Sequence, residues 1–206
     1  MKIKRLKKLL GYAPNVLLPR IVRNGWLSLR TRSFVSPGAD VYHGSKVRIG
    51  RSCLIDACLI DGNGRGSVAV DIGDDCLIHR NTVVRAVGGS VKIGRGTSIQ
   101  HFTSVYGLGN TTIGDNVLIA SHCAIAVAQH NFGDGSVPIA NQGTTDADTV
   151  IESNVWLGAH VVVFAGVTIG QGSVIGAGAV VNRNIPPGSI AVGVPAKVLR
   201  KREIDH

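Results

Sequence analysis

The 206-residue chain has few aromatic and few charged side chains. Aromatic residues make up 4% of it and charged residues 17%, whereas charged residues make up about 25% of an ordinary globular domain. Its four cysteines form no Cys-x-x-Cys pair, so neither a zinc clip nor a redox motif is indicated. No run of 18 or more apolar residues occurs, so we expect no membrane-spanning helix. A reduced, cytoplasmic protein fits this composition.

Acidic residues are absent from residues 1–33, which carry nine of the 22 lysines and arginines. Residues 34–206 hold 13 basic and 13 acidic side chains, so the whole net charge of +9 belongs to the N-terminal segment. A basic surface spread over the fold, of the kind that binds nucleic acid, is therefore not indicated. We expect no nucleic-acid partner.

An aliphatic residue recurs every six positions through most of the chain. A period of six does not fit an α-helix, whose apolar face recurs every 3.6 residues, but it fits short strands separated by corners. Three such strands make a triangular coil of about eighteen residues, and stacked coils bury their aliphatic residues in columns. The 27 glycines suit corners that need a positive φ. We call the recurring positions register residues; they are Ile49, Ile55, Ile72, Ile78, Val84, Ile93, Ile99, Val105, Ile113, Ile119, Ile125, Ile151, Leu157, Val163, Ile169, Ile175 and Val181.

This repeat resembles that of the hexapeptide-repeat acyltransferases over about residues 40–200. The resemblance implies an all-β solenoid, a left-handed parallel β-helix. We expect three parts, namely a basic amphipathic helical segment over residues 1–35, the β-helix over 36–190, and a tail with a short C-terminal helix over 191–206.

The six-residue register is interrupted between residues 125 and 151, where we expect a protruding loop over residues 129–149. Long loops on compact scaffolds tend to carry function. The stretch Ile-Gly-Asp-Asn-Val-Leu-Ile-Ala that starts at Ile113, with His130 seventeen places after Ile113, resembles the catalytic segment of the galactoside and maltose O-acetyltransferases. That resemblance implies that His130 is the general base, a role that suits a neutral imidazole. Candidate carboxylate partners of His130 are Asp134, Asp146 and Glu152.

The same resemblance assigns the remaining site residues. Trp156, in the stretch Asn-Val-Trp-Leu-Gly, is implied to line the active-site cleft beside the acceptor. Gln100 stands where the family has an asparagine, so the amide is kept with one more methylene. Acetyl-CoA is the implied co-substrate, and its phosphates would attract basic side chains. The implied contacts are Ala159 and Ala177 for the pantetheine arm, Asn182 and Arg183 for the adenosine end, and Lys197 and Arg200 for the phosphates.

Three histidines about one coil apart suggest a zinc site like that of the hexapeptide-fold carbonic anhydrases. However, His79, His101 and His122 follow their register residues by one, two and three places. Their side chains should therefore not converge within one subunit, and we expect no metal.

The N-terminal segment interleaves its nine cations with apolar residues. The spacing of Leu18, Ile21 and Val22 fits a basic amphipathic helix. Two interpretations remain open. The segment contacts an anionic membrane surface through residues 1–33, or its helix packs on the first coil or on a neighbouring subunit.

The leading interpretation of function is transfer of an acetyl group from acetyl-CoA to a sugar hydroxyl, in the modification of a cell-surface polysaccharide. The resemblance also implies a homotrimer with active sites between subunits and a saccharide acceptor. A second interpretation, N-acetylation of a nucleotide-linked amino sugar, uses the same histidine and the same donor. A zinc hydratase and a non-catalytic β-helix scaffold are further alternatives.

Overall fold

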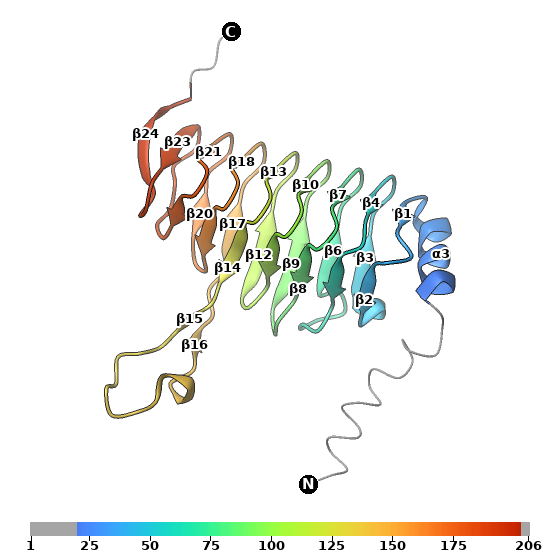
Figure 1. Ribbon diagram of the computed structural model, residues 1–206, viewed down its shortest axis with the longest axis horizontal. Coiled ribbons are helices and arrows are strands. Elements are labelled where there is room, and N and C mark those ends of the chain that lie inside the picture. Colours follow the sequence, from blue (N-terminus) through green and yellow to red (C-terminus); the bar gives the residue numbers. More distant parts are fainter. Residues whose placement is uncertain (1–19, 203–206) are drawn as a thin grey trace.

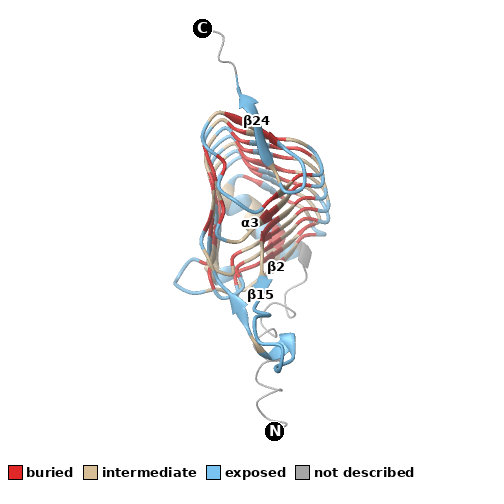
Figure 2. Ribbon diagram, turned by 90° about the vertical axis from the view of Figure 1, so that its left-hand side faces the viewer, coloured by how far each residue is buried: buried red, intermediate tan, exposed pale blue. Residues whose placement is uncertain are grey.

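The structure is a computed structural model, and it describes residues 20–202. Within this range the chain winds into a left-handed parallel β-helix of about seven turns. Figure 1 shows the turns side by side along the long axis, and Figure 2 looks along that axis, with buried residues lining the interior. The solenoid predicted from the six-residue period is confirmed.

Three parallel sheets, named A, B and C here, form the faces of a three-sided prism. Sheet A comprises β1 (Phe34–Val35), β4 (Leu54–Ile55), β7 (Leu77–Ile78), β10 (Ser98–Ile99), β13 (Leu118–Ile119), β18 (Trp156–Leu157), β21 (Val174–Ile175), β23 (Ser189–Val192) and the antiparallel β24 (Lys197–Lys201). Sheet B comprises β2 (Asp40–Tyr42), β5 (Leu59–Asp61), β8 (Val83–Arg85), β11 (Ser104–Tyr106), β14 (Ala124–Val127), β19 (Val162–Phe164) and β22 (Val180–Val181). Sheet C comprises β3 (Val47–Ile49), β6 (Val70–Ile72), β9 (Ser90–Ile93), β12 (Asn110–Ile113), β17 (Thr149–Ile151) and β20 (Thr168–Ile169), and the short 3-10 helix η1 (Gly44–Lys46) joins β2 to β3.

The register residues form the core of the prism. All of them are buried, and most are inaccessible to solvent. Neighbouring coils align them in the same register, as in the pairs Ile78 with Ile99 and Ile99 with Ile119. Burying an aliphatic side chain of this size stabilises the fold by about 1.5 to 3 kcal/mol. Each coil therefore depends on its neighbours to cover its apolar residues.

The cysteines belong to the same interior. Cys53, Cys76 and Cys123 are buried, and each directs its Sγ at the carbonyl oxygen of a glycine in the next coil, at 3.1 to 3.2 Å. Burial raises the pKa of the Cys58 thiol to about 12. These thiols act as small packing groups.

Glycines that directly follow register residues have a steric cause. A Cβ on Gly94 would lie 2.5 Å from the backbone of Gly114 in the next coil. A Cβ on Gly170 would lie 2.4 Å from the nitrogen of Pro187. At this corner, between sheets C and A, successive coils lie too close together to leave room for a side chain at the glycine position.

The N-terminal end of the prism is covered by the helix α3 (Arg20–Thr31). The rest of the predicted basic segment, residues 1–19, lies outside the described residues. None of the helices in the part of the chain that the structure describes is long and apolar enough to cross a bilayer.

The prediction of a C-terminal helix within residues 191–206 is wrong for the described part of that range. Gly193 adopts a φ of 96° and reverses the chain, and β24 then runs antiparallel to β23. Without β24, β23 would be an open sheet edge with unpaired backbone N–H and C=O groups. A strand can form hydrogen bonds with these groups along the edge, whereas a helix cannot. The expected boundary after residue 190 falls inside β23.

Between β14 and β17 the chain leaves the prism and forms a long protrusion (Figure 1). It contains β15 (Gln129–His130), the 3-10 helix η2 (Ile139–Asn141) and β16 (Thr144–Thr145). Only β15 and β16 pair within it, as an antiparallel ribbon. This protrusion coincides with the interruption of the six-residue register.

Candidate active site

His130 lies at the base of the protruding loop, on the edge between sheets B and C. A β-bulge in β14, with Ala126 at a φ of 56°, turns the chain out of the sheet just before it. His130 then pairs with Thr144 across the ribbon, and both residues are exposed. The bulge and the ribbon together hold the imidazole outside a rigid scaffold.

A hydrogen-bond network centred on Gln142 holds the loop together. Its Nε2 donates to the carbonyl oxygens of Asp134 and Val137, both at 2.7 Å, and its Oε1 accepts from the Asp134 nitrogen at 3.1 Å. Asn131, next to His130, donates to the Gln142 carbonyl oxygen at 3.1 Å. The loop therefore has a defined shape although nearly all of its residues are exposed.

Two of the three predicted carboxylate partners of His130 are engaged elsewhere. Asp134 accepts from the nitrogen and the hydroxyl of Ser136, at 2.9 and 2.6 Å, and these bonds lower the pKa of its carboxyl group. Glu152 accepts from the Gln171 nitrogen at 2.6 Å on a different edge of the prism. Asp146 is exposed in the loop. Within residues 20–202, no hydrogen bond joins the His130 ring to any of these carboxylates.

The edge between sheets A and B carries three other predicted site residues. Gln100, Ala159 and Ala177 each follow a strand of sheet A and lie at this corner in different coils. Gln100 is partly buried and donates from Nε2 to the Ser98 hydroxyl at 3.2 Å. The backbone groups of the two alanines are therefore aligned along this edge, which suits contacts to the extended pantetheine arm.

Beside these residues runs a column of stacked rings that we call the ring ladder. Phe102 stacks on His122 with 5.0 Å between ring centroids, and His122 stacks on His160 at 4.8 Å. All three residues have a φ near 60°. Each follows its register residue by three places, so this common spacing is the signal in the sequence that indicates the ladder.

The three histidines considered as a metal trio do not form one group. The rings of His79 and His101 lie 4.8 Å apart, closer than their offsets predicted, whereas His122 belongs to the ring ladder. Burial and the nearby His101 lower the pKa of His79. Over the described range, no three histidine, cysteine or acidic side chains are arranged to hold a metal ion.

Trp156 lies on the outer face of sheet A and is 53% exposed. It is in register with Leu118 and Val174, and the three side chains line a cleft of about 370 Å³. A second cleft of about 530 Å³ adjoins it, because Asn154 and Arg202 line both. Trp156 is therefore a wall of a groove at the corner between sheets C and A.

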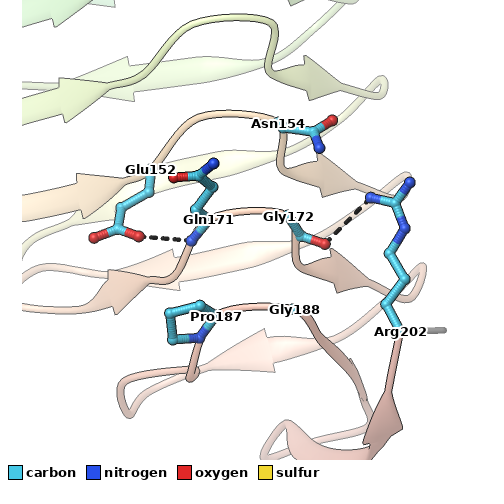
Figure 3. A pocket seen from close by; sticks show the side chains of 7 residues that line it. All are labelled: Glu152, Asn154, Gln171, Gly172, Pro187, Gly188 and Arg202. Atoms are coloured by element: carbon cyan, nitrogen blue, oxygen red, sulfur yellow. Dashed lines mark hydrogen bonds between the residues drawn. The ribbon is translucent and has the colours of Figure 1, made fainter. Parts of the chain in front are cut away.

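Figure 3 shows the larger cleft, with Glu152 and Arg202 on opposite sides. The Arg202 guanidinium donates to the carbonyl oxygen of Gly172 at 3.4 Å. The predicted phosphate contacts Lys197 and Arg200 lie exposed on β24. Arg202, which was not among the predicted contacts, is the basic side chain that lines both clefts.

The remaining predicted contacts, Asn182 and Arg183, follow β22 at the corner between sheets B and C and are exposed. The predicted site residues thus occupy three different edges of the prism. His130 lies on the B–C edge, Ala159 on the A–B edge, and Trp156 by the C–A edge. One chain by itself does not bring them together.

Comparison with known proteins gives consistent matches. The bacterial transferase hexapeptide family (six repeats) matches residues 148–183. Galactoside O-acetyltransferase of Escherichia coli is 38% identical over 119 residues, which are 55% of this chain and 55% of that protein. Galactoside O-acetyltransferase of Lactococcus lactis is 33% identical over 132 residues, 64% of this chain and 62% of that protein. The chain spans about half the length of the curated relatives it matches.

Among solved structures, a hexapeptide-repeat-containing acetyltransferase from Vibrio cholerae, complexed with acetyl-CoA, is similar to this chain with a TM-score of 0.55. It is 33% identical, and the match covers 63% of this chain and 72% of that one.

Proposed function

This chain belongs to the hexapeptide-repeat transferase family, and from that premise we propose that it transfers an acetyl group from acetyl-CoA to a sugar hydroxyl. The observation that carries the proposal is His130, held outside a rigid solenoid by a bulge and a ribbon. The galactoside O-acetyltransferases that it resembles are named for this chemistry. A saccharide unit of a cell-surface polysaccharide is the acceptor class to test first.

His130 serves as the general base in this proposal. Its neutral imidazole takes the proton of the acceptor hydroxyl while the hydroxyl oxygen attacks the thioester carbonyl carbon. The carbon–sulfur bond then breaks, and the imidazolium returns the proton to the CoA sulfur. The products are an acetyl ester and free CoA. The exposed ring leaves room for both substrates.

The donor would bind along the edges of the solenoid. Backbone groups of Ala159 and Ala177 suit the pantetheine arm because they lie in line on one edge. Arg202 lines both clefts near Trp156, and cations at the rim of a site attract the phosphates of CoA. Further proposed contacts are Asn182 and Arg183 at the adenosine end and Lys197 and Arg200 at the phosphates.

A homotrimer is part of the proposal, because the site residues lie on three edges and a second copy is needed to join them. Sheet A also presents a column of side chains in which exposed Leu54 and Leu77 lie on one side of Ser98, and exposed Leu118 and Trp156 lie on the other. Exposed apolar side chains gathered on one face are typical of a protein interface. Closed cyclic symmetry would use the same face in every subunit.

The oligomer can be tested with a charge on this column. We expect Leu77→Asp to reduce the mass measured by light scattering from three chains to one, because three carboxylates would be buried at the interface. Val68→Asp is the matched control, since both residues are 41% exposed and Val68 lies outside the sheets. A monomeric wild type, or an unchanged trimer in Leu77→Asp, would contradict this part of the proposal.

The activity itself is tested by acetyl-CoA-dependent release of free thiol with a panel of sugars. We expect His130→Ala to lower kcat by about a thousandfold, within the usual range for loss of a general base. The midpoint of thermal unfolding should not change, because the residue is exposed and outside the core.

Asn141→Ala serves as the control because Asn141 is an exposed polar residue of the same loop. We expect it to keep the wild-type rate. Equal turnover in His130→Ala and the wild type would refute the assigned base. Absence of CoA binding by the wild type would refute the acetyl-transfer proposal as a whole.

A further inference from the structure

The helix α3 turns its polar side toward the protein. Asn24 is fully buried and donates from Nδ2 to the carbonyl oxygens of Ser36 and Ala39, at 2.7 and 3.0 Å. The Arg23 guanidinium donates to the carbonyl oxygens of Ala39 and Val41, at 3.3 and 3.1 Å. These bonds cap backbone groups at the open end of the first coil. The helix is therefore anchored to the solenoid by these polar contacts and by Leu27, which packs against the core.

The opposite side of α3 is apolar and exposed. Val22, Trp26 and Leu29 are spaced by four and three residues, so they form one stripe along the helix. They are 56%, 57% and 83% exposed. Arg30 flanks the stripe, with its guanidinium 5.2 Å from the centre of the Trp26 ring. A helix that serves only to cover a core does not need this second apolar stripe on its solvent side.

This apolar stripe faces away from the coils, because the inner side of α3 is bonded to the first one. Figure 1 shows α3 at one end of the stack, with β24 at the other end. Subunits that pack against sheet A would lie beside the coils and not beyond this end. Neighbouring subunits of the proposed trimer would therefore leave the stripe uncovered, so its occupant approaches from the N-terminal end of the solenoid.

The charge of the segment indicates what the occupant is. Residues 1–33 carry nine cations and no acidic residue. Two copies of this chain meeting end to end through α3 would bring Arg30 and Arg32 of each copy close together, and like charges oppose such contact. An anionic lipid surface satisfies both features, because it attracts the cations and accepts the apolar stripe. Tryptophan is also a preferred residue at the boundary between headgroups and acyl chains.

We infer that the N-terminal end of the solenoid docks on an anionic lipid bilayer, with Val22, Trp26 and Leu29 inserted between the headgroups. The inner side of α3 stays bonded to the first coil while its outer side enters the membrane surface. This inference uses a region distant from the proposed active site and does not depend on the proposed reaction. It combines the two interpretations of the N-terminal segment that the sequence left open.

The test is co-sedimentation of the full chain with vesicles of phosphatidylcholine alone or mixed with phosphatidylglycerol. We expect binding to the mixed vesicles at low salt, and weaker binding as salt is added. The double variant Trp26→Gln and Leu29→Gln should lower the partition coefficient by about tenfold or more, because it removes the apolar contribution and keeps every cation. Glutamine favours helix, so α3 should persist.

Leu199→Gln is the matched control, because Leu199 is 68% exposed on β24 at the opposite end of the stack. We expect it to bind vesicles like the wild type. The inference is overturned if the wild type does not pellet with anionic vesicles at low salt. It is also overturned if the double variant pellets equally well, since residues other than the stripe would then account for binding.

Fluorescence gives a second, positional readout. The chain has two tryptophans, so Trp156→Phe leaves Trp26 as the sole reporter. We expect its emission to shift to shorter wavelength with anionic vesicles and to be quenched by lipids brominated near the headgroup. Unchanged emission in bound protein would overturn insertion of the stripe. Self-association that depends on Trp26 in the absence of lipid would show that a second copy is the occupant.

Discussion

The coils of the solenoid and the loop that interrupts them are stabilised in opposite ways. In the coils, a register residue such as Ile93 is almost completely buried between neighbouring turns. In the loop, residues 129–141 are all exposed, and side-chain hydrogen bonds around Gln142 set the conformation. The coils thus supply stability, whereas the loop positions His130. Stability and the proposed chemistry should therefore respond separately to mutation.

The largest expected effect on stability comes from the core. Ile93→Ala should lower the free energy of unfolding by about 3 kcal/mol, because it removes buried methyl groups and leaves a cavity. Lys92→Ala, the exposed neighbour on the same strand, should change it by about 0.5 kcal/mol or less. Thermal or denaturant unfolding measures both. Similar losses in the two variants would show that burial in the coils does not dominate stability.

Trp156 offers an intermediate case, because it lies on the rigid solenoid yet faces a cleft. Trp156→Ala should raise the KM for acetyl-CoA or for the sugar about tenfold, which corresponds to about 1.4 kcal/mol of lost binding. The unfolding midpoint should fall little, since the ring is half exposed. Steady-state kinetics, with acetyl-CoA and the sugar varied in turn, show which of the two KM values is raised. A large loss of stability with an unchanged KM would assign Trp156 to packing instead.

The smallest expected effect concerns the loop. Gln142→Ala removes three hydrogen bonds that join distant parts of the loop, each worth about 1 kcal/mol or less at an exposed site. We expect kcat to fall about fivefold with the unfolding midpoint unchanged. Asn141→Ala, one residue earlier, controls for a change in the loop surface. If Gln142→Ala lowered the unfolding midpoint as much as Ile93→Ala, the separation between coils and loop would be contradicted.

Much of the coil architecture could be predicted because it is encoded by short-range periodicity. Every predicted register residue is buried, and the interruption after Ile125 coincides with the protruding loop. The ring ladder of Phe102, His122 and His160 obeys the same periodicity and could have been found from it. These rings lie at corners outside the core, where the apolar period gives no direct signal.

Other features could not be predicted because they depend on contacts between distant segments. Nothing in the local sequence indicated that residues 197–201 would pair with β23, since the pairing depends on the free edge of the last coil. The engagement of Glu152 with Gln171 is likewise a contact between successive coils. The same holds for Arg202, whose place at both clefts follows from the reversal at Gly193.

The sequence by itself determined the coil, its register, the place of the loop and the position of the N-terminal charge. It could do so because a six-residue period specifies which side chains face inward, whatever lies further along the chain. Only the tertiary structure decided which edge of the prism each site residue occupies and which side of α3 faces solvent. Those outcomes depend on how coils stack and how the open ends are capped, since backbone groups there need partners from distant segments.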